Sequence, residues 1–355
     1  MTGSPPRPGY NPARLLRLIR ESIDRCELDL RSSVVLTEAA VGAYAVTPIL
    51  AALAGARQVF ALTRTGKHGT VEEVTRQTRA LAKLAGVEGR IDIRTDRSPE
   101  VIGQADIVTN SGHVRPIDRE FVAHLRPTAV IPLMYESWEF RAGDIDVDAC
   151  SEQRIPVAGT NERHPCVDVF SYLGIMAVKL LLDAGVAVHG SRILLLCDNP
   201  FAEFIERGLQ GAGATVECRP QLTPLDDATA LDAVLVALRP AQPRKLGRLE
   251  AELLGTRRDG AIVAQYFGDM EREHFATMGV PVWPLEAPAP GHMGILPSAV
   301  GPEPVVRLQC GGLKVGELLW RARQAGVSPD QAVASAVEAG FADVLVIDDR
   351  CGARG

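Results

Sequence analysis

Short apolar runs alternate with helical patterns along the first half of the chain. Residues 34–37, 59–63, 91–94, 107–110, 129–134 and 157–160 form β-branched or aliphatic runs, and helical patterns lie between them at 44–54, 70–85 and 118–125. Strands that are connected through helices favour right-handed crossovers and a parallel sheet with helices on both faces. The pattern therefore predicts a doubly wound α/β domain in this half.

The second half repeats this arrangement. A long apolar stretch, residues 167–184, predicts a helix that ends at Gly185 and connects the two halves. After it, the runs expected to be strands are residues 192–197, 215–218, 233–237, 261–265 and 280–283, with a helical pattern at 201–210. The predicted fold class is therefore α/β, with two doubly wound Rossmann-like parallel-sheet domains and a helical C-terminal extension.

Four segments are expected along the chain: an N-terminal amphipathic helix at 1–31, a first Rossmann-like domain at 32–165, a second one with its linking helix at 166–311, and a helical segment at 312–355. Asn11 and Pro12 are typical of a helix N-cap and first helical position, and Ser328 with Pro329 repeats this signal near the C-terminus. The glycine-rich run 311–316 is interpreted as a turn followed by the start of a packed helix.

Composition and charge exclude several classes of protein. The chain has 355 residues, of which 46% are hydrophobic and 23% charged, and its formal net charge is −6. Because acidic and basic residues are mixed and form no basic stripe, nucleic acid is not an expected partner. No apolar run reaches the ~20 residues of a membrane span, and the N-terminus lacks the charged and apolar regions of a signal peptide. We therefore expect no membrane partner.

The cysteines point to a reducing compartment. There are seven of them, an odd number without any C-x-x-C pair, which predicts reduced thiols rather than a disulfide framework. The cytoplasm is therefore the expected location.

No His or Cys spacing typical of a structural metal site is present, so no metal is predicted. A homodimer is expected from the frequency of dimers among soluble oligomers alone.

Polar side chains gather in the loops that follow the predicted strands. In open parallel sheets, ligands bind beyond the carboxyl ends of the strands, where loops and helix N-termini meet. The loops of the first half contain Asn110, His113, Arg115, Glu136, Arg141, Asn161, Glu162 and His164. This concentration exceeds what solvation requires, and it predicts a ligand site in the cleft between the two halves.

The first βα turn stands where a dinucleotide fold places its phosphate loop. This turn runs from Thr37 to Tyr44 and includes Glu38, but Gly42 is its only glycine, so the G-x-G-x-x-G fingerprint is absent. A helix N-terminus can still bind phosphate through its exposed amides. Arg64 follows the second strand, where an NAD site usually has an acidic residue, and it favours the 2′-phosphate of NADP over NAD.

The corresponding turn of the second half, residues 197–203, contains no glycine. Asp198 or Asn199 can cap the helix that Pro200 begins, and an acidic side chain there would occupy the place of a phosphate oxygen. This half is therefore expected to have lost dinucleotide binding.

Residues 105–295 resemble the D-2-hydroxyacid dehydrogenase superfamily. The resemblance follows the order of residues 144–157, the helix at 167–184, the strand that Gly190 precedes, the run 260–264 and the motif Gly291-His-Met-Gly294. It implies a substrate domain, a linking helix, an NAD-binding domain and a catalytic histidine at His292. The nucleotide fingerprint and the arginine that the family carries after the strand beginning near Gly260 are missing, and the first half looks like a complete cofactor fold.

The first half also resembles S-adenosylmethionine-dependent methyltransferases, through residues 86–92 and 105–110. That family normally has a glycine-rich first loop and an acidic residue at the end of the second strand. This sequence has neither feature.

The leading hypothesis is an NAD(P)-dependent oxidoreductase that acts on a small polar substrate, for which a carboxylate is one option. His292 would be the general acid or base, with Glu136 or Glu162 orienting it and His113 as a further catalytic candidate. The cofactor candidates are Glu38, Gly42, Tyr44, Arg64 and Asn110, and the substrate candidates are Arg115, Arg141, Asn161 and Glu162. An alternative role for His292 is to close a hydrogen bond in a tight turn.

Two other functions stay open at this point. One is a non-redox transferase of the S-adenosylmethionine type, and the other is a ligand-binding protein that has lost dehydrogenase chemistry. Failure to bind a nicotinamide cofactor favours the first alternative, and tight binding without turnover favours the second.

Overall fold

The computed structural model describes residues 7–66, 68–224, 230–240, 246–257 and 259–345. Its contacts divide the chain into two compact units. Unit 1 consists of Met1–Val169 and Gly301–Gly355, and unit 2 consists of Phe170–Val300. Compared with the expected segments, the N-terminal helix and the C-terminal segment both belong to unit 1, because they pack against its sheet.

The sheet of unit 1 has the strand order β3-β2-β1-β4-β5-β6-β12. A parallel bridge between Ile107 and Val130 joins its four-stranded and three-stranded parts, and only β12 is antiparallel. The first six strands have the order 3-2-1-4-5-6 of a dinucleotide-binding fold. The strands are β1 (Val34–Glu38), β2 (Gln58–Leu62), β3 (Ile91–Arg94), β4 (Ile107–Val108), β5 (Ile131–Pro132), β6 (Val157–Thr160) and β12 (Ala342–Val344).

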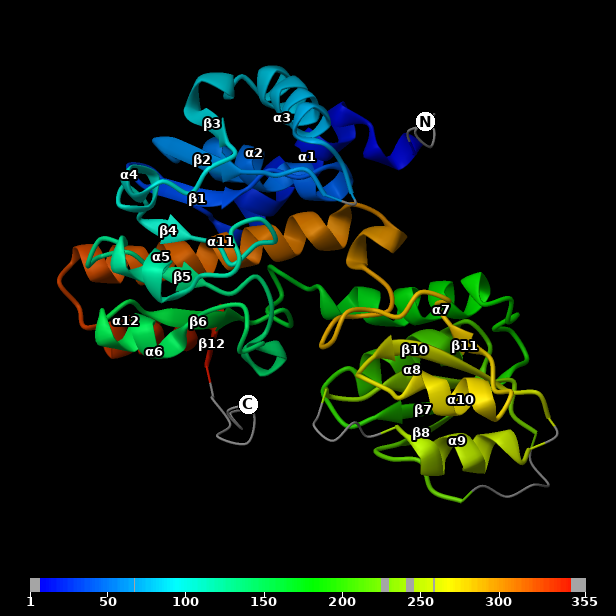
Figure 1. Ribbon diagram of the computed structural model, residues 1–355. Helices are drawn as coiled ribbons and strands as arrows, with labels where there is room; N and C mark the ends of the chain where they lie inside the picture. Colours follow the sequence, from blue (N-terminus) through cyan, green and yellow to red (C-terminus); the bar gives the residue numbers. More distant parts are fainter. Residues whose placement is uncertain (1–6, 67, 225–229, 241–245, 258, 346–355) are drawn as a thin grey trace. The chain divides into compact units, whose positions relative to one another are not determined.

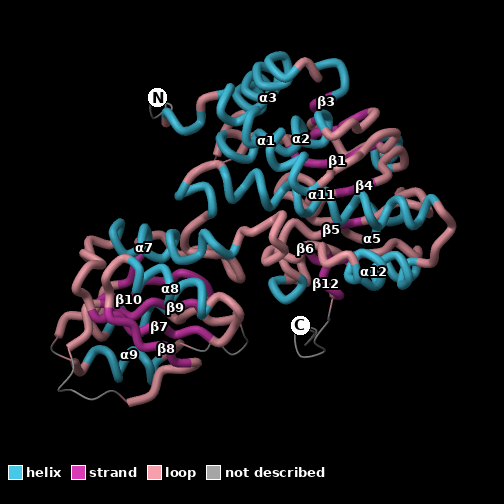
Figure 2. The backbone as a smooth tube through the Cα atoms, turned by 180° about the vertical axis from the view of Figure 1, so that it is seen from behind, coloured by secondary structure: helices cyan, strands magenta, loops and turns pink. Residues whose placement is uncertain are grey.

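Helices cover both faces of this sheet (Figures 1 and 2). One face carries α1 (Pro12–Cys26), α2 (Val46–Leu53), α3 (Val71–Ala85) and α11 (Glu303–Gln324). The other carries α4 (Pro99–Ile102), α5 (Arg119–Ala123) and α6 (Val147–Glu152), while α12 (Pro329–Glu338) packs against α11 and β12. A separate apolar core lies on each face, as the doubly wound pattern predicts.

The glycine-rich run 311–316 lies inside α11, so its interpretation as a turn was wrong. Figure 2 shows α11 crossing the strands of unit 1, and it contacts β4, β5 and β6. A side chain at Gly316 would place its Cβ 2.7 Å from Ile107 and 3.1 Å from Pro132, and one at Gly311 would lie 2.8 Å from Val167. The absence of side chains at these glycines lets the helix backbone approach the strands closely. The packing that this allows offsets the low helix propensity of glycine.

Unit 2 has a five-stranded parallel sheet of order β11-β10-β9-β7-β8. Its strands are β7 (Arg192–Cys197), β8 (Thr215–Arg219), β9 (Ala233–Ala237), β10 (Ile262–Phe267) and β11 (Val282–Trp283). Its helices are α7 (Leu173–Asp183) and α8 (Ala202–Gly211), which pack on each other, and α9 (Arg248–Gly255) and α10 (Arg272–Thr277), which form a second pair. Numbered within the unit, the order is 2-1-3-4-5, the other common doubly wound arrangement, so the predicted fold class is confirmed.

The helix boundaries follow the local signals in the sequence. Asn11 accepts hydrogen bonds from the backbone N–H groups of Ala13 (2.9 Å) and Arg14 (3.5 Å), as expected for the N-cap of α1. Ser328 and Gln331 form a capping box at the start of α12. Both predicted helix starts are therefore confirmed.

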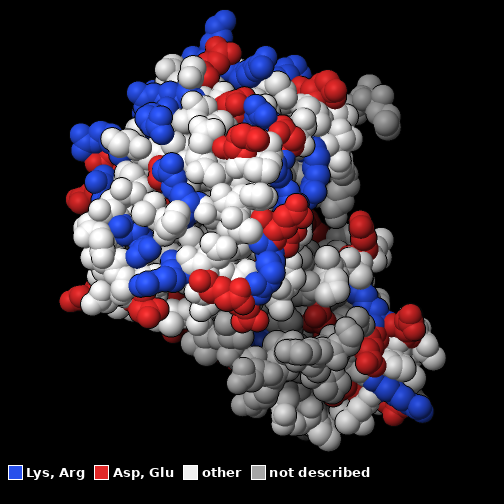
Figure 3. Space-filling view, turned by 60° about the vertical axis from the view of Figure 1, so that its left-hand side comes forward, with Lys and Arg blue, Asp and Glu red and all other residues white. Residues whose placement is uncertain are grey.

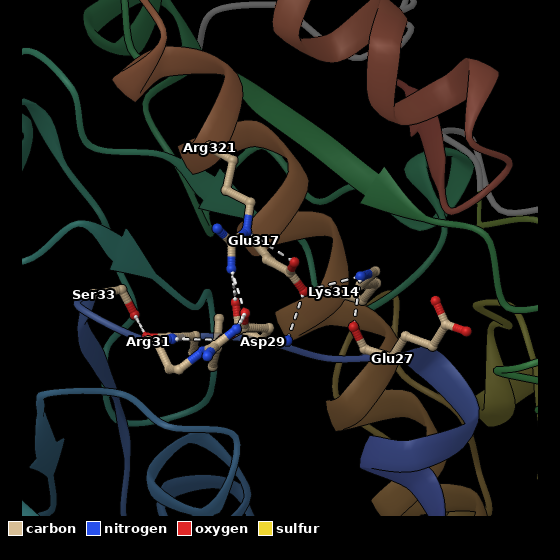
Figure 4. Close-up of polar contacts among 8 residues, drawn as sticks. Glu27, Asp29, Arg31, Ser33, Lys314, Glu317 and Arg321 are labelled. Atoms are coloured by element: carbon tan, nitrogen blue, oxygen red, sulfur yellow. Dashed lines mark hydrogen bonds and ion pairs between the residues drawn. The ribbon is translucent and has the colours of Figure 1, made fainter.

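Hydrogen bonds and ion pairs of charged side chains connect the segment after α1 to α11 (Figure 4). The buried carboxylate of Glu317 accepts hydrogen bonds from the Asp29 backbone N–H (2.9 Å), Lys314 Nζ (3.0 Å) and Arg321 Nε (3.0 Å). Lys314 Nζ also donates to the Glu27 carbonyl at 2.9 Å. We name Glu27, Asp29, Lys314, Glu317 and Arg321 the clamp, because they join the N-terminal and C-terminal pieces of unit 1.

Replacing the central carboxylate should destabilise unit 1. In Glu317→Ala, the buried ammonium of Lys314 and the Asp29 N–H lose their acceptor, and loss of one partner of a buried ion pair costs about 3–5 kcal/mol. The control is Glu21→Ala, which removes the exposed Arg17–Glu21 pair and should cost less than about 0.5 kcal/mol. Urea unfolding followed by tryptophan fluorescence measures both changes, and equal costs would contradict a structural role of the clamp.

The surface shows no single dominant charge on the side seen in Figure 3, where acidic and basic side chains are interspersed. Within the described residues, none of the helices has the length and apolar character that crossing a membrane requires.

Candidate functional site

The strand order of unit 1 reverses between β1 and β4, and several polar groups lie at the carboxyl ends of these two strands. The Thr109 hydroxyl is 2.8 Å from the Thr37 hydroxyl and 2.9 Å from the Ser111 hydroxyl. These contacts hold the two diverging strands together just below the crevice in which open α/β sheets bind ligands. We name this region, with the loops that follow β1, β2 and β4, the β1–β4 edge.

Glu38, the last residue of β1, is buried at the β1–β4 edge. Only 8% of its surface is exposed, and its Oε2 accepts a hydrogen bond from the His113 backbone N–H at 3.2 Å. A Cβ at Gly112 would lie 2.6 Å from the same oxygen, so a larger residue there would displace the Glu38 carboxyl from its present position. Burial raises the pKa of Glu38, although the His113 N–H and Arg115 oppose the shift.

Two buried donors at this edge have no hydrogen-bond partner among the described residues. They are Asn110 Nδ2, after β4, and Thr63 Oγ1, after β2, and each residue is 2% exposed. The other end of the Asn110 amide is fixed, because its Oδ1 accepts from the Met134 N–H at 2.8 Å. A buried donor without an acceptor costs about 1–3 kcal/mol, so both are candidates to meet a ligand or water.

Positive groups lie in the loops after β2 and β4. Arg64 is exposed and donates to the Arg115 carbonyl at 3.1 Å, and within the described residues it makes no ion pair with a carboxylate. The half-buried imidazole of His113 has a lowered pKa because of burial first, and of Arg64 and His68 second. His113 is therefore held in its neutral form, which can accept a proton.

The predicted cofactor residues Gly42 and Tyr44 lie in the short helix η2 (Gly42–Ala45), which precedes α2. Gly42 has a φ of +64°, in the left-handed region that favours glycine, and its N–H donates to Gln77 at 3.2 Å. Glu38, Gly42, Arg64 and Asn110 thus belong to loops or strand ends on one edge of unit 1, as predicted.

Three glutamates form an acidic group beyond β5 and β6. Glu136 is fully buried and accepts hydrogen bonds from Trp138 Nε1 (2.5 Å) and Arg163 Nε (3.2 Å). Burial and the charge of Glu136 raise the pKa of Glu139 to about 8, and burial raises that of Glu162 well above its usual range. Among the described residues, no group of three or more His, Cys, Asp or Glu side chains could hold a metal ion.

The two arginines expected to bind a substrate carboxylate converge on a carboxylate of the chain. Arg115 and Arg141 each donate to Asp144 Oδ2 at 2.8 Å, and the Tyr135 hydroxyl donates to the same oxygen at 2.9 Å. Two guanidinium groups thus hold one carboxylate, and they also act on the neighbouring carboxyls: Arg115 on Glu38 and Arg141 on Glu139. The role of these arginines in substrate binding stays a prediction.

Asn161 and His164 have local structural contacts. The Asn161 amide donates to the Gly340 carbonyl at 2.8 Å, and its Oδ1 accepts from the Arg163 N–H at 3.1 Å. The His164 ring stacks on Phe341 with 3.9 Å between the ring centroids. These contacts hold the loop after β6 against the segment that leads to β12.

In unit 2 the strand order reverses between β7 and β9, and side chains of the chain bridge that point. Asn199 Nδ2 donates to the Ala237 carbonyl (2.6 Å), and its Oδ1 accepts from the Phe201 N–H (3.0 Å) ahead of α8. Asp198 Oδ1 accepts from the Arg239 N–H at 2.8 Å. The expected cap was therefore wrong: α8 begins at Ala202, after Pro200, and neither Asp198 nor Asn199 caps it, because their oxygens accept from amides outside the helix. The loss of dinucleotide binding in this unit stays a prediction.

His292 lies in a turn of unit 2, whereas Glu136 and Glu162 lie in unit 1. Its Nδ1 is 3.0 Å from the Pro290 carbonyl oxygen, and the preceding Gly291 N–H donates to Asp269 at 3.0 Å. Gly294 packs directly against the Gln265 carbonyl. These contacts fit the structural role considered for His292, and its catalytic role stays a prediction.

Sequence reasoning missed Thr63, Glu139 and Asp343 as members of these groups. Asp343 belongs with the acidic group beyond β5 and β6, because its charge, after burial, is a further cause of the raised pKa values of Glu136 and Glu162. It lies in β12, the antiparallel edge strand, where it pairs with Gly159 of β6. Glu139 had a detectable signal, since it stands in the same loop as Glu136, one turn further on. Thr63 had no signal in the sequence, because it is marked by a buried hydroxyl without a hydrogen-bond partner, and burial is known only from the folded structure.

Glu139 should make stability depend on pH. Its pKa is raised to about 8 in the folded state, so the stability contribution of the protonated carboxyl is complete below the unfolded value and is lost as pH rises through about 8. Glu139→Gln should therefore stabilise the protein by about 1–2 kcal/mol above pH 8, allowing for partial exposure, and change little at pH 4. Thermal melts across this range measure it. The exposed Glu120→Gln is the control, and an identical pH slope in parent and Glu139→Gln would contradict the assignment.

Comparisons with known proteins support the fold. No family model matches the chain, and no curated protein does. Solved structures of similar fold include a dipicolinate synthase from Bacillus halodurans (10% identity, TM-score 0.51, 79% of this chain and 96% of that one). Another is a dipicolinate synthase from Bacillus subtilis (11% identity, TM-score 0.52, 84% and 99%). An NAD⁺-bound 3-phosphoglycerate dehydrogenase from Entamoeba histolytica matches more weakly (12% identity, TM-score 0.42, 83% and 97%).

These matches define the class of the fold. The chain has the two-domain Rossmann-like fold of the two dipicolinate synthase structures, whose TM-scores exceed 0.5. These two structures bear out the expected two-domain Rossmann-like fold, and the resemblance to the D-2-hydroxyacid dehydrogenase superfamily stays a prediction. At these identities the likeness concerns the fold and not the activity.

Proposed function

We propose that the protein is an NAD(P)-dependent oxidoreductase that holds its dinucleotide at the β1–β4 edge and acts on a small polar substrate. The observation that carries this proposal is Glu38, a buried carboxyl of raised pKa at the point where the strand order reverses. Ligands of open α/β sheets bind at such points, and carboxyls of shifted pKa in them are candidates for function.

The charge of this edge suits an anionic cofactor. Burial raises the pKa of Glu38, which shifts this carboxyl toward its protonated form, and a protonated carboxyl does not repel a pyrophosphate. Asn110 Nδ2 and Thr63 Oγ1 supply buried donors that have no partner among the described residues. Gly42 and Tyr44 would line the first turn, and Arg64 would bind the 2′-phosphate of NADP, since it pairs with no described carboxylate.

The substrate we propose carries a carboxylate. The two structures that support the fold are named for dipicolinate synthase, and dipicolinate is a pyridine dicarboxylate. In this chain Arg115 and Arg141 converge on Asp144, and a substrate carboxylate could take the place of Asp144 as the acceptor of their guanidinium groups. Asn161 and Glu162, in the loop after β6, complete the proposed substrate set.

His113 is the proton-transfer group that this site favours. Its imidazole is kept neutral by burial and by nearby cations, and its backbone N–H contacts Glu38. A neutral imidazole at the edge of a cofactor site can take a proton from a hydroxyl during oxidation. His292 and Glu136 remain the other proposed catalytic residues.

Cofactor binding tests the proposal through two arginines at opposite ends of β2. Arg64 follows β2 and Arg57 precedes it, and both are exposed. Calorimetry with NADP⁺ and NAD⁺ should show that Arg64→Ala weakens NADP⁺ binding about tenfold or more, since a charge-assisted contact is lost, and leaves NAD⁺ binding unchanged. Arg57→Ala should change neither. No binding of either nucleotide by the parent protein would refute the proposal.

Turnover distinguishes the two histidines. With NADPH and a panel of 2-oxo acids, His113→Ala should lower the rate about 100-fold or more, with NADP⁺ affinity changed less than about twofold. A loss confined to His292→Ala would transfer the proton role to His292. Unchanged rates in both variants would remove both residues from the chemistry.

One alternative has a specific observation in its favour. The missing glycine fingerprint in unit 1 and the bridged turn at Asp198 and Asn199 in unit 2 fit a ligand-binding protein that has lost dehydrogenase chemistry. NADP⁺ binding without turnover of any 2-oxo acid would favour it. The S-adenosylmethionine-dependent transferase gains no support from the structures of similar fold.

A further inference from the structure

Two thiols meet where α1 packs against α11. Cys26 is the last residue of α1, Cys310 lies in α11, and they are 2% and 0% exposed. Cys310 Sγ is 3.2 Å from the carbonyl oxygen of Ser22, one helical turn before Cys26. This carbonyl belongs to the turn of α1 that ends at Cys26, so the two cysteine side chains are neighbours, although α1 and α11 belong to opposite ends of the chain.

The surroundings distinguish the two sulfur atoms. The hydrogen bond from Cys310 lowers the pKa of Cys26, burial opposes the shift, and Arg25, Lys314 and Arg307 assist it. The same hydrogen bond and burial raise the pKa of Cys310. Since the thiolate is the reactive form, Cys26 is the better nucleophile of the pair. Cys310 remains a thiol that can react in a second step.

The pair is buried, and Cys26 lies at the end of a helix beside a partly exposed segment. Cys26 Sγ is 3.6 Å from the carbonyl oxygen of Cys166, and Cys166 itself is partly exposed. Hydrogen peroxide would reach Cys26 through a local opening of the last turn of α1, since helix ends open more readily than cores.

We propose that Cys26 and Cys310 form a disulfide when the protein meets hydrogen peroxide. The thiolate of Cys26 attacks one peroxide oxygen, the O–O bond breaks, and the sulfenic acid forms with release of one water. The sulfur of Cys310 then attacks the sulfenyl sulfur, the S–O bond breaks, and a second water leaves. Two thiols lose two electrons in total, and one peroxide is reduced to two waters.

The disulfide would fasten the same two helices that the clamp joins. It would close a loop that runs from α1 through both units to α11, and cross-links that close long loops restrict the unfolded chain most. The oxidised protein should therefore unfold at a higher temperature than the reduced one, by about 5 °C or more in unit 1. This proposal does not depend on the proposed oxidoreductase activity.

Peptide mapping tests the pairing directly. The full chain is treated with hydrogen peroxide, denatured, alkylated without reductant and digested. Mass spectrometry should find a peptide that joins Cys26 to Cys310 and disappears on reduction. Cys218→Ser is the matched control, because Cys218 is exposed and is not part of the pair, and the linked peptide should persist in it. Cys310→Ser and Cys26→Ala should each abolish the linked peptide and the rise in unfolding temperature.

The opposite results are equally clear. If oxidised protein yields Cys26 only as a sulfenic, sulfinic or sulfonic acid, or linked to Cys166, the pairing is wrong. The same holds if Cys218 is fully oxidised while Cys26 and Cys310 are still alkylated as free thiols. Circular dichroism verifies that Cys26→Ala and Cys310→Ser fold. If one of them does not fold, the peptide map of the parent protein tests the pairing by itself.

Discussion

The close approach of α11 to the strands of unit 1 is the constraint on which the rest of the structure depends. Gly311, Gly312 and Gly316 let the helix backbone lie against β4, β5 and β6. The carboxylate of Glu317 then ties the segment after α1 to the same helix. Through α11 the chain returns from unit 2 and completes the core beneath β1 and β4. The β1–β4 edge is therefore supported by both ends of the sequence.

The carboxyl edge of unit 1 combines buried carboxyls with surface cations. Glu38, Glu136, Glu139 and Glu162 are driven toward their neutral forms by burial. Arg64 is exposed in the loop after β2, and Arg115 and Arg141 share Asp144. A carboxyl of raised pKa opposes an anion less than an ordinary carboxylate does, so the burial of Glu38 suits an anionic ligand at the β1–β4 edge. In unit 2 the equivalent point is bridged by Asp198 and Asn199, and this difference directs the proposal to unit 1.

Features that depend on neighbouring residues in the sequence, such as two helix caps and several strands, were predicted correctly. The caps at Asn11 and Ser328 and the strands β3, β6, β7 and β9 lie where the sequence pattern predicted them. The pattern failed for α11, because glycines normally interrupt a helix, and these are explained by tertiary packing, such as that of Gly311 against Val167 and of Gly316 against Ile107. The candidate residues Glu38, Arg64 and Asn110 could be chosen because each stands at or just after the end of a predicted strand. Thr63 and Asp343 could not be predicted in this way. Thr63 is marked by a buried hydroxyl without a hydrogen-bond partner, and Asp343 by the pairing of the edge strand β12 with β6.

The central claim is that the dinucleotide binds to unit 1, and hydrogen exchange of the backbone amides tests it most directly. Exchange is followed by mass spectrometry with and without saturating NADP⁺. We predict slower exchange in residues 38–45 and 110–115, at the ends of β1 and β4, and unchanged exchange in residues 197–203 of unit 2. Protection of residues 197–203 with no change at 38–45 would contradict the account and place the cofactor in the other unit.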